Sequence, residues 1–179
     1  FALFHNENDK KIFIENRIVN ESNCNVIPGS GVDLTLFKYA EKKYLDNQSL
    51  KFLYLGRIMR DKGIIEYLEA ICEISKKQLK VEFIFVGKIN YKDKKLTKLF
   101  NYCLNNKFIT YYNETNDVKN KIIVSDCIVL PSYREGLSKT LLEASAIGRP
   151  MLVSNVPGCN DVVIDNLNGF LFKPKDYKS

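Results

Sequence analysis

Two glutamates stand with seven residues between them in the stretch SYREGLSKTLLEAS, at residues 132–145. Glu135 precedes a glycine, whereas Glu143 lies among leucines and alanines that indicate a helix. Ser138 is placed to cap that helix, so the free backbone N–H groups of residues 137–139 would form an anion site. Two helical residues at this spacing lie roughly 80° apart around the axis, so the carboxylates would not share one face. We expect Glu135 in the loop and Glu143 in the helix, reaching different parts of one extended ligand.

The ordinary alternative for the same stretch needs no ligand. Glu135 would then interact with the positive end of the helix, and Glu143 would be an exposed helix former. Helix spacing alone favours this alternative, so the neighbouring segments have to decide between the two.

A cluster of basic residues follows a second strand-like segment, in LGRIMRDKG at residues 55–63. Arg57, Arg60 and Lys62 precede a predicted helix, an arrangement that suits a diphosphate. An arginine can grip two oxygens in a fork, and a lysine supplies a point charge. The alternative is a solvated basic turn in which Gly63 opens the helix.

Several other kinds of site are excluded by the residues present. GSGVDL (29–34) has Leu34 where a dinucleotide-binding loop needs its third small residue, and no Walker loop or Asp-x-Asp motif occurs. His5 is the single histidine, and the five cysteines are widely spaced without a Cys-x-x-Cys pair. We therefore expect reduced thiols in a cytoplasmic protein and no metal site.

The composition describes one globular domain with a basic surface. The chain has 179 residues, of which 45% are hydrophobic and 27% are charged, and its net charge is +6. This charge favours an anionic ligand or an anionic membrane face, although a lysine-rich solvated surface is the ordinary alternative. No nucleic-acid-binding motif is present, so we expect no nucleic acid partner. No apolar run approaches the roughly 20 residues that cross a bilayer.

Apolar strand-like runs alternate with amphipathic stretches over most of the chain. This alternation predicts an α/β fold: a Rossmann-like three-layer domain with a mostly parallel sheet, whose ligands bind beyond the carboxyl ends of the strands. Residues 1–50 are less regular, with one strand-like piece at 24–29 and a polar linker at 38–49. Strands are predicted at 51–56, 81–87, 108–112, 126–132, 150–155 and 169–173, and helices at 63–77, 94–106, 116–125, 138–147 and 158–165.

Taken together, the segments resemble a known family. IPGSGVDLTLF, LGRIMRDKG, FVG and the long stretch from VSDCIVLPSYREGLSKTLLEAS to NGFLF are similar to the nucleotide-sugar-binding half of bacterial GT-B glycosyltransferases. The group is the retaining family 4, and the resemblance covers nearly the whole chain. The Glu-x7-Glu spacing with these flanking residues is specific, whereas the bare spacing would be weak.

The resemblance implies a role for each matching residue. Arg57 and Lys62 would bind the donor diphosphate, and Glu143 the ribose hydroxyls. Glu135 would face the transferred sugar as the catalytic carboxylate. The family is usually metal-independent and uses no cofactor, because the nucleotide sugar is a substrate. The remaining donor-binding positions are the backbone N–H groups of Gly136, Leu137 and Ser138 for phosphate or sugar oxygens, and Tyr112 and Asn113 near the base.

The resemblance also implies a wider organisation. Residues 1–179 would be a single donor-binding domain, with the N-terminal acceptor-binding half and the extreme C-terminus absent, and would catalyse little alone. The expected donor is a UDP-sugar, and the expected acceptor is a glycan or lipid-linked saccharide of bacterial surface polysaccharide synthesis. The protein would be cytoplasmic and could associate peripherally with the inner membrane face. The alternatives are a non-catalytic nucleotide-sugar-binding module and a GT-B epimerase or phosphorylase.

Overall fold

The computed structural model describes residues 1–29, 31–43 and 48–178. The predicted linker at 38–49 lies only partly within it, because residues 44–47 are outside the described residues. The strands are β1 (Ala2–Phe4), β2 (Cys24–Val26), β3 (Leu50–Leu55), β4 (Val81–Val86), β5 (Ile109–Tyr112), β6 (Cys127–Leu130), β7 (Met151–Ser154) and β8 (Gly169–Phe172). The α-helices are α1 (Glu7–Glu15), α2 (Ile64–Ser75), α3 (Lys94–Asn105), α4 (Val118–Val124) and α5 (Lys139–Ile147). Two 3-10 turns, η1 (Glu21–Asn23) and η2 (Arg60–Lys62), complete the set.

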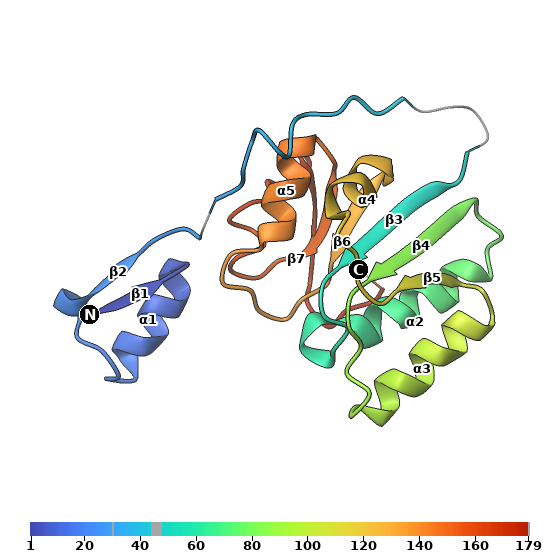
Figure 1. Cartoon of the computed structure of the whole chain (residues 1–179). Coiled ribbons are helices and arrows are strands. Elements are labelled where there is room, and N and C mark those ends of the chain that lie inside the picture. Colours follow the sequence, from blue (N-terminus) through green and yellow to red (C-terminus); the bar gives the residue numbers. More distant parts are fainter. Residues whose placement is uncertain (30, 44–47, 179) are drawn as a thin grey trace.

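Six of the strands form one sheet, in the order β5-β4-β3-β6-β7-β8. Every pair in this sheet is parallel, as the sequence predicts. Helices α2 and α3 pack against one face, and α4 and α5 lie on the other (Figure 1). The order reverses between β3 and β6, so the loops that follow these two strands diverge to opposite faces and leave a crevice between them.

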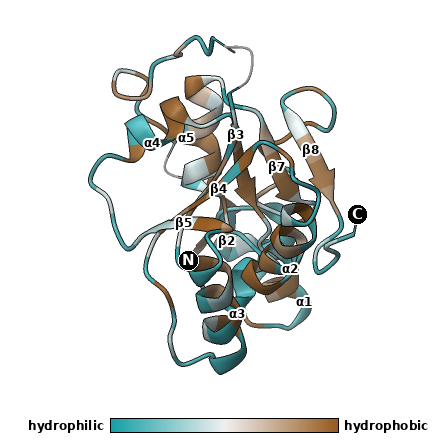
Figure 2. Ribbon diagram, turned by 90° about the vertical axis from the view of Figure 1, so that its right-hand side faces the viewer, coloured by the Kyte–Doolittle hydropathy of each residue, from teal (hydrophilic) through white to brown (hydrophobic). Residues whose placement is uncertain are grey.

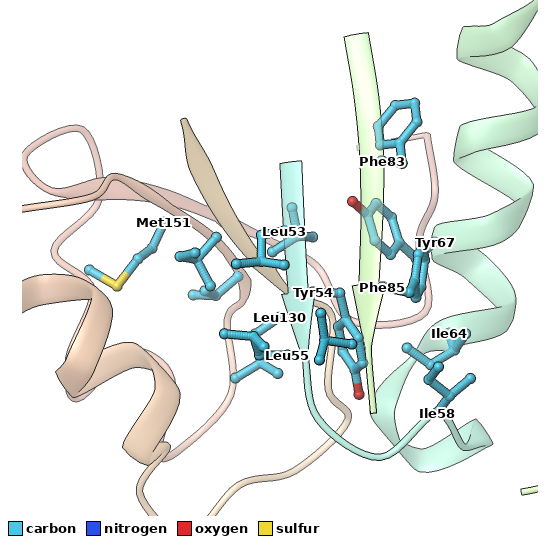
Figure 3. Close-up of a cluster of buried hydrophobic side chains, with 14 of the residues drawn as sticks. Leu53, Tyr54, Leu55, Ile58, Ile64, Tyr67, Phe83, Phe85, Leu130 and Met151 are labelled. Carbon is cyan, nitrogen blue, oxygen red and sulfur yellow. The ribbon is translucent and has the colours of Figure 1, made fainter. Parts of the chain in front are cut away.

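The core lies between the sheet and its helices. Tyr54 and Phe85, from the neighbouring strands β3 and β4, have ring centroids 5.5 Å apart, and Tyr67 of α2 packs on Phe85 at 5.3 Å (Figure 3). On the apolar face of α2, Ile64, Ile65, Leu68 and Ile71 are buried, and Cys72 is partly buried. Hydropathy colouring places the apolar residues on the strands and on the helix sides that face them (Figure 2). Continuous apolar strands fit a sheet that is covered on both faces.

Residues 1–27 are more regular than the sequence predicts. They form a small β–α–β unit in which β1 and β2 pair in parallel as a separate two-stranded sheet (Figure 1). The predicted strand at 24–29 is confirmed as β2, whereas β1 and α1 are not predicted. Strands of three residues and a helix with its apolar residues in one run, Ile12–Ile14, give little periodic signal.

Residues 31–43 connect this unit to the sheet by crossing over α4 and α5. Arg149, which is 3% exposed, donates to the carbonyl of Ala40 (2.9 Å) and to that of Ile123 (2.9 Å). Lys42 forms an ion pair with Asp126 (3.1 Å). These bonds tie the crossing segment to the domain at two points.

One predicted element is wrong. Residues 157–162 form consecutive turns, so the short helix expected at 158–165 is absent there. Gly158 has φ +80°, which breaks a right-handed helix, and its N–H donates to the Asp161 side chain (2.9 Å). No helix in the described part of the chain is long and apolar enough to cross a membrane.

Gly63 fixes how closely the start of α2 approaches the end of β6. Its φ is +65°, and a Cβ built there would lie 1.9 Å from the carbonyl oxygen of Pro131. No side chain fits at that distance, so the two loops of the crevice meet through bare backbone.

Gly63→Ala should therefore destabilise the fold by more than about 2 kcal/mol, because a left-handed φ and a backbone clash act together. Gly31→Ala is the matched control, since Gly31 has φ +70° but nothing within 4 Å of a built Cβ. It should cost only about 1 kcal/mol. Urea unfolding of both variants measures the difference, and equal losses would contradict this account.

Candidate functional site

The loops after β3 and β6 come together at the carboxyl edge of the sheet. Tyr133, after β6, donates its backbone N–H to the carbonyl of Asp61 in η2 (2.9 Å). Its hydroxyl donates to a carboxylate oxygen of Glu66 on α2 (2.6 Å). Together with the Gly63 contact, these bonds hold the basic loop against the loop that carries Glu135.

A cavity of about 460 Å³ opens at this edge. Arg57 from the basic loop and Glu143 from α5 both line it, so the structure brings together two residues that are distant in sequence. The Arg57 side chain is exposed and makes no hydrogen bond or ion pair among the described residues. An arginine fork that faces an open cavity is free to bind a phosphate.

Glu143 is buried, which rules out the alternative of an exposed helix former. It is 6% exposed, and its one ionic neighbour in the described chain is Lys139, 3.7 Å away and largely exposed. Burial raises the pKa of the Glu143 carboxyl, and Lys139 offsets only part of that effect. A buried carboxylate with a weak partner at a cavity wall is a candidate for binding ligand hydroxyls.

Lys62 and Glu135 form an ion pair. The Lys62 Nζ lies 2.6 Å from the Glu135 Oε1, and the two side chains are 20% and 13% exposed. The hydroxyl of Ser132, which is fully buried, donates to the same oxygen at 2.5 Å. The sequence predicted both charged residues as site residues but did not predict that they would bind one another.

Tyr54 connects the two halves of the site. Its hydroxyl donates to the carbonyl of Arg57 (2.7 Å). Burial raises the pKa of Tyr54, the negative charge of Glu135 raises it further, and the positive charge of Arg57 lowers it. The charges of Arg57 and Glu135 thus both act on the Tyr54 hydroxyl.

The loop from Gly136 to Ser138 offers two free backbone donors. The N–H groups of Gly136 and Leu137 donate no hydrogen bond within the described residues, but the N–H of Ser138 is directed at the Gly158 carbonyl (3.4 Å). Ser138 occupies the N-cap position of α5, as the sequence predicts, but its side chain makes no capping bond within the described residues. Its hydroxyl therefore stays available for a ligand.

Asn6 and Gly158 hold this loop from two sides. The Asn6 side chain, 6% exposed, donates to the carbonyl of Gly136 (2.9 Å) and more weakly to that of Glu135 (3.4 Å). A Cβ on Gly158 would lie 2.6 Å from both carbonyls. No sequence pattern predicts either contact, because both join residues far apart along the chain.

Tyr112 and Asn113 are placed beside the cavity rather than in its wall. The Tyr112 ring packs under the Lys121 ammonium, 3.6 Å from the ring centroid, and the Asn113 amide oxygen accepts a bond from Tyr111. The wall in this region is formed instead by Lys88 and by the loop at 114–116.

The remaining candidate groups, namely Arg60, the histidine and the cysteines, lie outside the cavity wall. Arg60, from the basic loop, makes a two-pronged bond to Asp93, at 2.8 and 2.9 Å. His5 is exposed, and all five cysteines are free thiols. No cluster of three or more His, Cys, Asp or Glu side chains that could hold a metal occurs among the described residues.

A second cavity, of about 340 Å³, lies between α2, one face of the large sheet and residues 175–177. Tyr67, Phe83, Leu152 and Phe172 make its wall mostly apolar. Glu66, Lys175 and Asp176 also line it, but Glu66 already accepts a bond from Tyr133. None of the site residues predicted from the sequence lines this cavity, so we assign the functional site to the polar cavity.

Residues 37–179 match the family model of glycosyl transferases group 1. A UDP-Gal:alpha-D-GlcNAc-diphosphoundecaprenol alpha-1,3-galactosyltransferase of Escherichia coli is 33% identical over 98% of this chain. The chain belongs to the glycosyl transferases group 1 family. A Campylobacter jejuni N,N'-diacetylbacillosaminyl-diphospho-undecaprenol alpha-1,3-N-acetylgalactosaminyltransferase is 27% identical over 98% of the chain. The chain spans about half the length of these relatives, 47% and 48%.

The fold of this group 1 chain matches solved GT-B structures. HepE of Anabaena, solved in complex with UDP and glucose, superposes with a TM-score of 0.83 at 17% identity, over 98% of this chain and 50% of that one. At this identity the likeness concerns the fold, and it confirms the predicted Rossmann-like α/β class. The family model and the curated relatives of the present chain confirm the broad class that the sequence predicts, a glycosyltransferase.

Glu143→Gln should stabilise the isolated chain at pH 7 by on the order of 1 kcal/mol, because the amide avoids ionising a desolvated carboxyl. The raised pKa means that ionisation opposes folding above that pKa. The gain should therefore vanish as the pH falls below about 4.3, the ordinary value for glutamate. Thermal unfolding of both proteins across this pH range measures the gain.

Glu73→Gln is the control for this comparison. Glu73 is exposed, and the hydrogen bond from Lys76 lowers the pKa of its carboxyl, so its replacement should not stabilise the chain. A Glu143→Gln variant no more stable than the wild type at pH 7 would contradict the conclusion that burial makes the ionised Glu143 carboxylate unfavourable for folding.

Proposed function

We propose that this chain is the donor-binding domain of a retaining family 4 glycosyltransferase that uses a UDP-sugar. One observation carries the proposal: Arg57 and the buried Glu143 face one cavity at the switch point of a parallel sheet. A cation and a hydroxyl-binding carboxylate in the wall of one cavity fit a nucleoside diphosphate, which has phosphates at one end of its ribose.

The donor would extend from the cavity toward Glu135. Glu143 would accept hydrogen bonds from the ribose hydroxyls, and Arg57 and Lys62 would bind the diphosphate. The free N–H groups of Gly136 and Leu137 would bind phosphate or sugar oxygens. The base would lie near Lys88 and residues 114–116, with Tyr112 and Asn113 behind them.

The chemistry of sugar transfer explains why these residue types are needed. When the sugar leaves, negative charge develops on the diphosphate, and fixed cations with backbone N–H groups stabilise it without a metal. The sugar ring becomes positively charged, and the Glu135 carboxylate would stabilise that charge. Glu135 is the proposed catalytic residue, and we propose that neither metal nor cofactor takes part.

The acceptor would bind to a part of the protein that this chain does not include. We propose a glycan or lipid-linked saccharide acceptor, because two relatives act on diphosphoundecaprenol-linked sugars. An N-terminal acceptor domain would complete the active site, so the chain alone would bind donor and transfer little sugar. Such an enzyme would work in the cytoplasm, attached peripherally to the inner membrane face.

Arg57→Ala should weaken UDP binding to this chain by about 1.5–3 kcal/mol, the range of a hydrogen bond to a charged group. Arg60→Ala is the matched control from the same loop, because Arg60 is bound to Asp93 and should change affinity far less. Isothermal titration calorimetry measures both. Unchanged affinity in Arg57→Ala would remove Arg57 from the site.

Glu135→Gln should lower kcat of the complete enzyme by about 100-fold or more, the scale of losing one preorganised electrostatic contact. It should not weaken UDP binding. Glu143→Gln should show the opposite pattern, with weaker UDP binding as its main defect. Sugar transfer to acceptor and calorimetry with UDP separate the two. If the complete wild-type protein binds a nucleotide sugar but transfers nothing, it is a binding module, and this proposal is wrong.

A further inference from the structure

Lys62 forms an ion pair with Glu135. Its ammonium lies 2.6 Å from Glu135, and this is the one ion pair that Lys62 makes among the described residues. Both side chains are mostly buried, so water screens the attraction less than at an open surface. Any anion that binds Lys62 must therefore weaken this pair.

Glu135 has a second donor that would remain after such an exchange. Ser132 donates to the same oxygen that faces Lys62, and its fully buried position gives the hydroxyl little freedom to turn elsewhere. Hydrogen bonds to ionised acceptors are among the stronger ones in proteins.

The other groups around Glu135 cannot replace Ser132. The Tyr54 hydroxyl donates to the Arg57 carbonyl, and the thiol of Cys159 is only a weak donor and makes no hydrogen bond to Glu135 among the described residues. Asn6 donates to the backbone of this loop and not to the carboxylate. Glu135 thus depends on two donors, of which one is the proposed diphosphate ligand.

We propose that Glu135 competes with the donor diphosphate for Lys62, and that Ser132 is a positioning residue that holds Glu135 when Lys62 turns to the phosphates. This inference rests on the proposed function, because it requires a diphosphate at Lys62. Its consequence is that the carboxylate lowers affinity for the nucleotide, since Lys62 must leave its partner and two anions are brought together.

Calorimetry with UDP on the isolated chain tests the competition. Glu135→Gln should bind UDP roughly three- to tenfold more tightly than the wild type, and Lys62→Ala should bind it more weakly. In the Lys62→Ala background, most of the gain from Glu135→Gln should disappear, because the two residues act on one another. Thermal unfolding of each variant verifies that it is folded.

The positioning role of Ser132 is tested by a second double-mutant cycle, again with UDP as the ligand. Ser132→Ala should weaken UDP binding roughly two- to fivefold in the wild type and leave it unchanged in the Glu135→Gln background. Ser132→Thr, which keeps the hydroxyl, should restore much of the affinity. A purely structural role would give the same loss in both backgrounds and would overturn this part.

The outcomes separate this inference from the proposed function. If the wild type binds UDP and Arg57→Ala weakens that binding, the donor site stands. Equal or weaker UDP binding by Glu135→Gln would then overturn the competition alone. A wild-type chain that binds neither UDP nor a UDP-sugar would overturn both.

Discussion

The parallel pairing of β3 with β6 is the constraint on which the site depends. Phe52 pairs with Cys127 and Leu53 with Ile128, so the two strands end side by side. The loops after these strands therefore start next to each other, and the bond from the Tyr133 N–H to the Asp61 carbonyl joins them (2.9 Å). This contact brings the basic loop within reach of Glu135, so the chemistry follows from the order of the strands.

Charge that is costly to bury is concentrated where the ligand is expected. Glu143 is desolvated with only a weak partner, whereas Arg60 and Arg149 are fully engaged by structural contacts. A fold that needed only stability would have little reason to keep a buried carboxylate facing a cavity. Lys62 and Glu135 differ from Glu143 because each has a close partner of opposite charge. We propose that an anionic ligand weakens this ion pair when it binds Lys62.

The sequence predicted the sheet and its helices well because they carry periodic apolar patterns, as in α2 and β4. It failed at residues 157–162, where a glycine with positive φ overrides the apparent helix, and at β1 and α1, whose patterns are too short. Residue type and family resemblance together predicted four of the site residues: Arg57, Lys62, Glu135 and Glu143. The burial of Glu143 and the bonds from Asn6 depend on tertiary contacts, which no spacing rule contains. The bond from Ser132 to Glu135 spans only three residues, but it depends on the conformation of the loop between them.

The central claim is that a nucleoside diphosphate binds between the basic loop and the start of α5. Mapping backbone amide NMR shifts of this chain during titration with UDP tests it most directly. The account predicts the largest changes at Arg57, Gly136 and Leu137, with Tyr67 and Phe172 of the apolar cavity unaffected. Changes confined to the apolar cavity, or none at saturating UDP, would contradict it.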